Sequence, residues 1–277
     1  MTVRLVGVFA HPDDDSYVLG GTLLLHPGEL EPSFVYATSG EAGPIAAGTA
    51  TRERLGAVRE GEQRAFLAAV GHPDAPARFL RHPDYHLPEV PFERLVGEVE
   101  AVLREIRPQL VVSFGPDGLT SHHDHMRAGE AAAEAFRRAR AAAGDPADAF
   151  LRLYQAAYPR SDVDRFYAGV RRGGFGYGEE GRLFDVTGVP DDRVAVRVDT
   201  RAVAKAKWAA ILHHRSLLDE HERIPEPLRW LVLDAECFVQ AFPPRPPGGP
   251  VLGDLLAGLG DRADPAGPGG AARTGRG

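Results

Sequence analysis

Short apolar runs alternate along the chain with longer segments in which apolar residues recur every three or four positions. Val3–Ala10 and Leu110–Phe114 are almost wholly apolar, as buried strands are. Thr51–Val70 and Phe92–Ile106 instead carry one apolar face, as amphipathic helices do. Strands that alternate with helices predict βαβ units around a mainly parallel sheet. The expected fold class is therefore α/β, with a Rossmann-like, mainly parallel sheet and helices on both faces.

The same two patterns predict the remaining elements. Further helices are expected at Tyr17–Leu25, Ala128–Ala143 and Ala202–His213, and further strands at Ser33–Ala37, Phe150–Gln155 and Val194–Val198. Residues 157–192 are expected to be rich in loops. Within them, Gly173–Gly181 has closely spaced glycines but lacks the Lys-Ser/Thr pair of a phosphate-binding loop. We expect a loop there that shapes the entrance to a site.

The composition changes sharply after Phe242. PPRPPGGP and DPAGPGGAARTGRG are dominated by proline and glycine and offer little apolar surface to bury. The sequence therefore predicts one domain over residues 1–242 and a disordered tail over residues 243–277.

Charge and cysteine content narrow the class of protein. The net charge of −7 gives no basic excess to hold nucleic acid or an anionic membrane, and no apolar run reaches the roughly 18 residues that span a bilayer. The single cysteine, Cys237, excludes an internal disulfide framework and a cysteine-rich zinc module. A reducing compartment fits this usage, so we expect a cytoplasmic protein.

Polar residues gather where predicted strands end. His11–Asp15 follows the first strand, Thr38–Gly43 the second, and the segment that ends in His122–His125 follows Leu110–Phe114. In an open parallel sheet, ligands bind outside the carboxyl ends of the strands. The sequence therefore predicts a functional site at this edge.

The residues of the first loop favour a metal ion over a nucleotide. Asp13, Asp14 and Asp15 occupy the place where a dinucleotide-binding fold carries glycines, and their charges would repel a phosphate. A catalytic zinc ion takes three protein ligands and a water. One histidine and one aspartate of this loop, with one histidine of His122–His125, supply that number and leave other acids and imidazoles for chemistry. Such ligands also suit Fe²⁺ and other divalent ions.

These motifs resemble those of the LmbE-like (PIG-L) N-acetylglucosaminyl deacetylases. AHPDDD at Ala10–Asp15, with Gly20–Thr22 after it, is similar to the AHPDDE motif of that family, and His122–His125 to its HPDH motif. Gly40–Gly43 and Arg59–Glu62 resemble its GE-x-G turn and R-x-x-E helix. The match spans residues 3–240 and is completed by a late segment similar to H-R-S-Q, namely His214-Arg215-Ser216.

The resemblance implies a role for each matched residue. It implies His11, Asp14 and His125 as the ligands of a zinc ion. It implies Asp13 as the general base, His122 as the histidine that stabilises the oxyanion or aids proton transfer, and Asp124 as the carboxylate supporting His122. Substrate contacts are implied for Arg59, Asp84 and His214. Three positions depart from the family pattern: Asp15 in place of Glu, His123 in place of Pro, and Leu217 in place of Gln.

The resemblance thus implies a zinc-dependent hydrolase that removes an acetyl group from an N-acetylglucosamine-type conjugate, a small-molecule substrate. An amidase acting on a mycothiol-type conjugate is the alternative. A sugar- or metal-binding module without catalysis fits less well, since Asp13, His122 and Asp124 are all present. No nucleic-acid or membrane partner is expected, and a homo-oligomer is left open.

Overall fold

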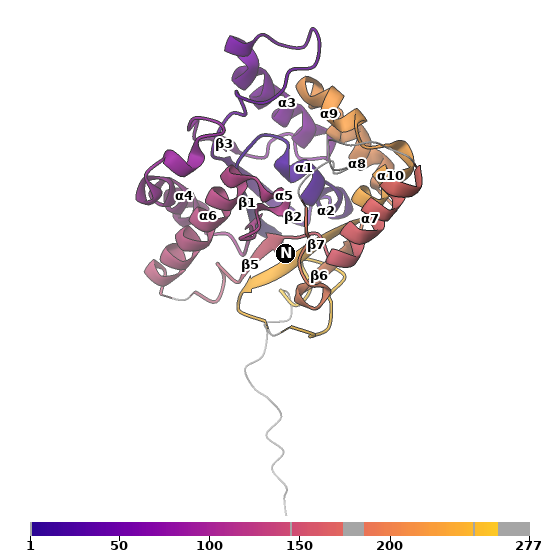
Figure 1. Cartoon of the computed structure of the whole chain (residues 1–277). Coiled ribbons are helices and arrows are strands. Elements are labelled where there is room, and N and C mark those ends of the chain that lie inside the picture. The colour runs from indigo at the N-terminus through magenta and orange to yellow at the C-terminus, as the bar shows by residue number, and fades with distance from the viewer. Residues whose placement is uncertain (1, 145, 174–185, 246, 260–277) are drawn as a thin grey trace, which may run out of the picture.

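We describe the protein from a computed structural model of the 277-residue chain. The structure describes residues 2–144, 146–173, 186–245 and 247–259 (Figure 1). Most of the glycine-rich segment Gly173–Gly181 and the last 18 residues of the chain lie outside this part.

Over these residues the chain forms one seven-stranded sheet in the order β3-β2-β1-β4-β5-β7-β6. The strands are β1 Val3–Phe9, β2 Leu30–Tyr36, β3 Ala77–Phe79, β4 Leu110–Phe114, β5 Arg152–Ala156, β6 Val196–Asp199 and β7 Ala235–Phe242. Strands β1 to β5 pair in parallel, whereas β7 is antiparallel to both β5 and β6. The predicted α/β class with a mainly parallel sheet is confirmed.

Helices cover both faces of the sheet. Figure 1 shows α4 and α6 on one side and α2, α8 and α10 on the other. The helices are α1 Asp14–Val18, α2 Gly20–Leu25, α3 Leu55–Ala69, α4 Phe92–Ile106, α5 Gly118–Ser121, α6 His123–Ala142, α7 Arg160–Gly173, α8 Ala204–Ile211, α9 Leu218–Glu222 and α10 Glu226–Leu233. None of the helices within the described ranges is long and apolar enough to cross a membrane.

Strand β1 and helix α4 illustrate why the local sequence patterns succeed. Strand β1 lies between β2 and β4 and is covered on both faces, so nearly every residue in it is buried. Helix α4 buries Leu95, Val99 and Val102 on one face and ends where Arg107 takes a left-handed conformation before Pro108. Both elements match their predicted bounds to within one residue.

The second half of the chain departs from two expectations. Residues 157–192 were expected to be loops, but they contain the 14-residue helix α7. Residues beyond 242 were expected to be disordered, yet Leu255 and Leu259 are buried in the main core and Leu252 forms a bridge with Val196. A few leucines spaced among the glycines are therefore enough to pack the described part of this segment against the sheet.

Candidate metal centre

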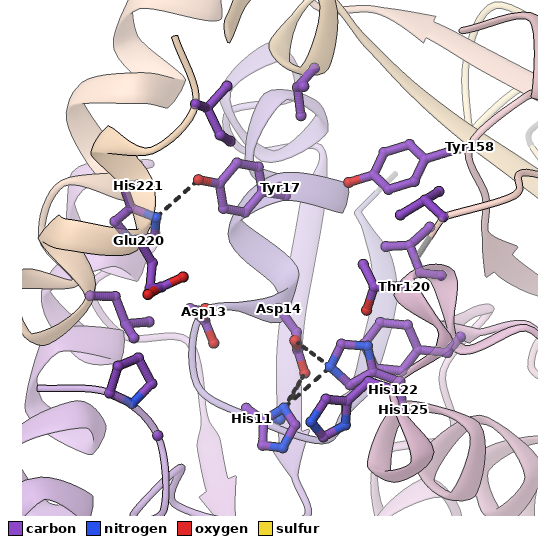
Figure 2. A pocket seen from close by; sticks show the side chains of 18 of the residues that line it. His11, Asp13, Asp14, Tyr17, Thr120, His122, His125, Tyr158, Glu220 and His221 are labelled. Carbon is purple, nitrogen blue, oxygen red and sulfur yellow. Dashed lines mark hydrogen bonds and ion pairs between the residues drawn. The ribbon is translucent and has the colours of Figure 1, made fainter. Parts of the chain in front are cut away.

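The carboxyl ends of β1 and β4 lie side by side and bring the two polar clusters together. The loop after β1 supplies His11, Asp13 and Asp14, and helix α1 begins within it. After β4 the chain makes the short turn α5 and enters α6, whose first turn contains Asp124 and His125. Figure 2 shows the labelled side chains of both segments converging on one cavity.

His11, Asp14 and His125 meet at distances that fit one metal ion. His11 Nδ1 lies 3.2 Å from His125 Nε2. The Asp14 carboxylate lies 3.1 Å from His125 Nε2 and 3.6 Å from His11 Nδ1. Ligand atoms held at about 2.0–2.1 Å around a tetrahedral zinc ion are roughly 3.4 Å apart. The three predicted ligands therefore match the spacing that a single zinc ion requires.

The outer nitrogen of each of these histidines is held by the protein. The His125 Nδ1–H group donates a hydrogen bond to the carbonyl oxygen of Gly118 at 2.9 Å. The other ring nitrogen, Nε2, therefore faces the cluster. His11 Nε2 lies 3.0 Å from an Asp84 oxygen and 3.4 Å from an Asp124 oxygen. Such outer contacts fix the tautomer and the ring orientation of metal-binding histidines.

The electrostatics of the cluster also call for a cation. Burial opposes a charge on His11, but the carboxylates of Asp124, Asp14 and Asp84 outweigh it and raise its pKa well above the usual value. Burial likewise opposes ionisation of Asp14, but His125 and His11 hold the pKa of this carboxyl well below its usual range. The histidines and carboxylates of the cluster thus stabilise each other's charged forms.

Asp13 lies beside the cluster and points into the cavity. Its carboxylate is 3.0 Å from Arg59 Nη2, and its backbone N–H donates to Gln63 Oε1 at 2.9 Å. Burial raises the pKa of Asp13 to about 6, against the opposing effect of the Arg59 guanidinium. A carboxylate whose pKa is close to neutrality is suited to accept and return a proton.

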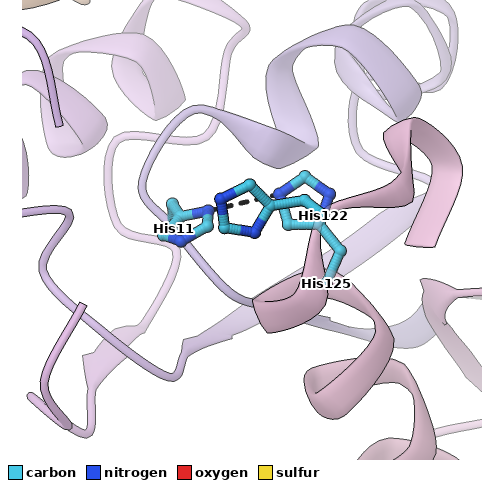
Figure 3. Close-up of side chains that lie close together, drawn as sticks. All are labelled: His11, His122 and His125. Carbon is cyan, nitrogen blue, oxygen red and sulfur yellow. Dashed lines mark hydrogen bonds between the residues drawn. The ribbon is translucent and has the colours of Figure 1, made fainter. Parts of the chain in front are cut away.

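His122 is the third imidazole at the cluster. Its ring packs edge-on against His11, with 4.9 Å between centroids, and close to His125 (Figure 3). His11, His122 and His125 also form a group whose ring nitrogens are close enough to share an ion. Burial, reinforced by the two neighbouring histidines, lowers the pKa of His122 to about 4, so the ring is neutral at pH 7.

Asp124 does not support His122 as predicted. Its fully buried carboxylate accepts the backbone N–H groups of Tyr85 and Leu87 and faces His11 Nε2. His122 is the N-cap of α6, and its Nδ1 atom accepts a hydrogen bond from the backbone N–H of Asp124. Asp124 therefore contacts His122 through its backbone and not through its carboxylate. The Asp124 carboxylate is thus occupied by the Tyr85–Leu87 segment and His11 rather than by His122.

Two of the three residues predicted to contact substrate line the cavity, and the third does not. Asp84 lines the cavity, but its carboxylate contacts His11 Nε2 and the Ala42 N–H. Arg59 lines the cavity as well, and its guanidinium donates to the carbonyl oxygens of Gly40 and Pro12. His214 does not line it: the side chain is fully buried, with its ring beside Phe66. The prediction that His214 contacts substrate is therefore wrong.

The close packing of Arg59 explains the glycines of the second loop. Gly40 has a φ of 66°, and a Cβ atom there would lie 2.2 Å from Arg59 Nη1. Only glycine allows both this conformation and this approach. The glycines of the Gly40–Gly43 turn therefore leave the space that the Arg59 guanidinium occupies.

Sequence reasoning missed Gln63 and Tyr85. Gln63 is fully buried on α3 and bridges the Asp13 N–H to Asp15 Oδ2. Tyr85 is 60% exposed, and its ring stands edge-on to those of His122 and His123 at the cavity rim. The spacing of Arg59 and Gln63, four residues apart on a predicted helix, was the only available signal for Gln63.

The cluster opens into a cavity of about 550 Å³. His11, Asp13, Asp14 and His122 line its inner end, and residues of α7, α9 and α10 line its outer part. A volume in this range holds a whole small molecule rather than a metal ion and water alone.

Fold and site together define a class: an α/β protein with a metal-binding cluster of histidine and aspartate at the carboxyl edge of its parallel strands. Comparisons with known proteins agree. Residues 6–136 match the family model PIG-L, described as GlcNAc-PI de-N-acetylase. A 1D-myo-inositol 2-acetamido-2-deoxy-alpha-D-glucopyranoside deacetylase of Thermomonospora curvata is 31% identical over 243 residues, covering 77% of this chain and 80% of the relative. The chain belongs to the PIG-L (LmbE-like) family.

Solved structures confirm the fold. The N,N'-diacetylchitobiose deacetylase from Pyrococcus horikoshii aligns with a TM-score of 0.59 and 20% identity, over 88% of this chain and 84% of that protein. The 4-carboxy-2-hydroxymuconate hydratase GalB from Pseudomonas putida aligns with a TM-score of 0.58 and 20% identity, over 89% and 98%. A deacetylase and a hydratase thus share this fold, so the reaction must be argued from the site.

Proposed function

We propose that this protein is a metal-dependent N-deacetylase that acts on an N-acetylglucosamine-type conjugate. The observation that carries the proposal is the cluster of His11, Asp14 and His125, whose donor atoms lie 3.1–3.6 Å apart with Asp13 beside them. The relative from Thermomonospora curvata is named as a deacetylase of an acetamido sugar, which supports the same reaction.

His11, Asp14 and His125 would hold the ion, and zinc is the one that their chemistry suits best. When bound, such an ion polarises an amide carbonyl and lowers the pKa of water. The buried outer contacts of His11 and His125 keep both rings oriented toward it. Asp15 stays outside this set because it is fully buried and its pKa is raised by burial to about 8, which leaves the carboxyl protonated at pH 7.

Asp13 acts as the general base. Its carboxylate points into the cavity beside the cluster and takes a proton from the attacking water. Arg59, 3.0 Å away, keeps this carboxylate oriented. After the amide carbon is attacked, Asp13 returns the proton to the departing amine. Neutral His122, on the other side of the cluster, donates a hydrogen bond to the oxygen of the former carbonyl group.

Metal content and turnover, measured together, test the proposal. We expect the purified protein to release amine from N-acetylglucosamine conjugates, to lose activity when a chelator removes the ion, and to regain it with Zn²⁺. Asp13→Asn should keep the metal but lower kcat by about 10²–10⁴-fold, the usual range for general base catalysis. His125→Ala should lose both the metal and the activity.

The matched control is His26→Gln. His26 lies far from the cluster along β1, at the end of α2, and pairs with Glu29. This variant should keep wild-type metal content and turnover. Near-wild-type turnover by Asp13→Asn would refute the base assignment, and full activity after complete removal of metal would refute the proposed function itself.

A further inference from the structure

The outer part of the cavity differs in character from its inner end. We name six residues the outer wall: Tyr158, Val163, Phe166, Ile224, Leu231 and Val232. They come from the segment before α7, from α7 itself, and from α10 with the turn before it. Figure 2 shows Tyr158 and Tyr17 across the cavity from His11, so the wall faces the metal centre rather than lying beside it.

One residue of the outer wall is unusually exposed for its type. Leu231 is 41% exposed, whereas Leu233, two residues further along α10, is fully buried. Only three large apolar side chains in the described part of the chain are this exposed. Leu231 and the other residues of the outer wall together present apolar side chains to the cavity, as the walls of small-molecule sites do.

The acidic side chains near the outer wall are already paired. Asp162 forms ion pairs with Arg165 and, at 2.6 Å, with Arg197. Glu220 pairs with Arg223 at 2.9 Å. These carboxylates therefore do not make the outer wall a site for a cation.

Two polar side chains at the inner end, Arg59 and Asp84, are held by contacts within the protein. Arg59 donates to two backbone carbonyl oxygens and to Asp13, and Asp84 holds His11 and the Ala42 N–H. A polyol placed against the outer wall would lose water without gaining hydrogen bonds from these groups, which is unfavourable. The substrate in the name of the relative from Thermomonospora curvata carries such a polyol, a myo-inositol joined to the acetamido sugar.

We propose that the substrate of this protein carries an apolar group of several carbon atoms, attached to the amide-bearing sugar, which packs against the outer wall. The inference rests on the proposed function, because it takes the scissile amide to lie at the metal centre. The apolar group can belong to either of two parts of the substrate. It is an alkyl or aryl aglycone, or it is an acyl chain longer than acetyl.

A substrate series tests the inference. The zinc-loaded protein is assayed on N-acetylglucosamine, its hexyl and phenyl glycosides, its myo-inositol glycoside, and N-hexanoylglucosamine. Each buried methylene group should raise kcat/KM by roughly fourfold, so a substrate that fits the wall should exceed N-acetylglucosamine by at least tenfold. A gain with the glycosides assigns the wall to the aglycone, and a gain with the hexanoyl amide assigns it to the acyl chain.

Paired variants connect the preference to the outer wall. Leu231→Asp should abolish the gain from the apolar group, mainly through KM, so that kcat/KM becomes similar for the apolar substrates and for N-acetylglucosamine. Val251→Asp is the matched control, because Val251 is also an exposed apolar residue, at 52%, but does not line the cavity. It should behave like the wild type.

A binding measurement separates this inference from the proposed function. Hexyl glucoside contains no amide, and it should raise Tm of the wild type and of Val251→Asp more than that of Leu231→Asp. If no substrate releases amine but this pattern of Tm shifts holds, the outer wall is supported and the deacetylase assignment fails. Equal kcat/KM across the series, a preference for the inositol glycoside, or the same Tm shift in all three proteins would overturn the inference.

Discussion

Asp13 has a backbone conformation that few residues other than glycine adopt. Its φ is 110°, and the contacts around it hold the chain in that state. Gln63 Oε1 accepts the Asp13 N–H, and Arg59 Nη2 donates to the Pro12 carbonyl oxygen. A non-glycine residue with positive φ persists only where its surroundings fix it. Helix α3 therefore positions the proposed base through two side chains one turn apart.

The shorter acid at position 15 explains why Gln63 is needed. Asp15 stands where the family motif has Glu, and Gln63 Nε2 reaches its Oδ2 atom at 3.0 Å. The amide of Gln63, which is fully buried, thus spans Asp15 and the Asp13 N–H. We infer that the shorter side chain at position 15 and the glutamine at position 63 function as a pair.

A double-mutant cycle tests this pairing. Gln63→Ala leaves two buried polar groups without their partner, and should lower kcat by about ten- to a hundredfold through misplacement of Asp13. Asp15→Glu alone should also slow the enzyme, because the longer side chain collides with Gln63. The combined variant should recover at least part of the lost kcat with unchanged metal content. If the two losses simply multiply, the residues act independently and the pairing is wrong.

Between elements, the decisive contact is that of α6 with β4. Gly129 of α6 packs against the backbone of Phe114, and a Cβ atom on Gly129 would lie 2.5 Å from the Phe114 carbonyl oxygen. The Phe114 ring in turn stacks on His125, 4.2 Å away between centroids. This close approach sets the distance from His125, on α6, to His11, on the loop after β1.

Adding one methyl group at this contact should therefore affect the metal site. Gly129→Ala forces α6 away from β4, and we expect it to lower the free energy of unfolding by about 1–3 kcal/mol and to weaken zinc binding. Gly61→Ala is the control, since Gly61 lies on the exposed face of α3 with open space around it. It should stabilise the protein by about 0.5–1 kcal/mol. Urea unfolding and zinc titration measure both effects, and unchanged zinc affinity in Gly129→Ala would contradict this role for α6.

The sequence predicts the elements whose own residues determine them. β1 and β4 are apolar throughout because they lie in the middle of the sheet, and the α4 face repeats with the period of a helix. The start of α6 was predicted at Ala128 rather than His123, because its first turn is made of polar site residues instead of a helical apolar pattern. β7 was missed because polar Glu236 and Gln240 lie on either side of its centre and leave only a short apolar run between them.

The same distinction applies to the site. Residues that follow strand ends could be placed near one another from sequence alone, since parallel strands end at one edge. The partners of Asp124, Asp84 and His214 could not, because they depend on contacts between segments far apart in the chain. The His214-Arg215-Ser216 segment is an example. The carboxylate of Glu62 accepts hydrogen bonds from Ser216, 154 residues away, and this contact holds the segment inside the protein.

At the scale of the whole molecule, two histidines are buried in their neutral form. Burial lowers the pKa of His221 to about 4, and it lowers that of His214 well below the usual value. His221 lines the cavity, where its Nδ1 atom accepts the Tyr17 hydroxyl at 3.0 Å, and the His214 ring lies 6.4 Å from it between centroids. In the unfolded chain their pKa values return to about 6.5. The unfolded state therefore binds protons first as the pH falls.

The resulting pH dependence can be stated with its sign. Stability from His221 is fully present above about pH 6.5 and is lost progressively as the pH falls toward 4, which amounts to about 2 kcal/mol at pH 5. His214 and His122, whose pKa values are also lowered by burial, add loss in the same direction. Urea unfolding of the protein in EDTA at pH 7.5 and pH 5.0 measures the sum without any contribution from metal release.

Two substitutions decide whether the buried histidines cause this loss. His221→Gln removes one proton-binding group from the unfolded state and should make the loss of stability between pH 7.5 and 5.0 smaller. His86 is exposed, and its hydrogen bond with Glu89 raises its pKa, so its contribution has the opposite sign: stability present at low pH that is lost as the pH rises. His86→Gln should therefore leave the acid loss as large or slightly larger. An equal acid loss in the wild type and His221→Gln would contradict this role for His221.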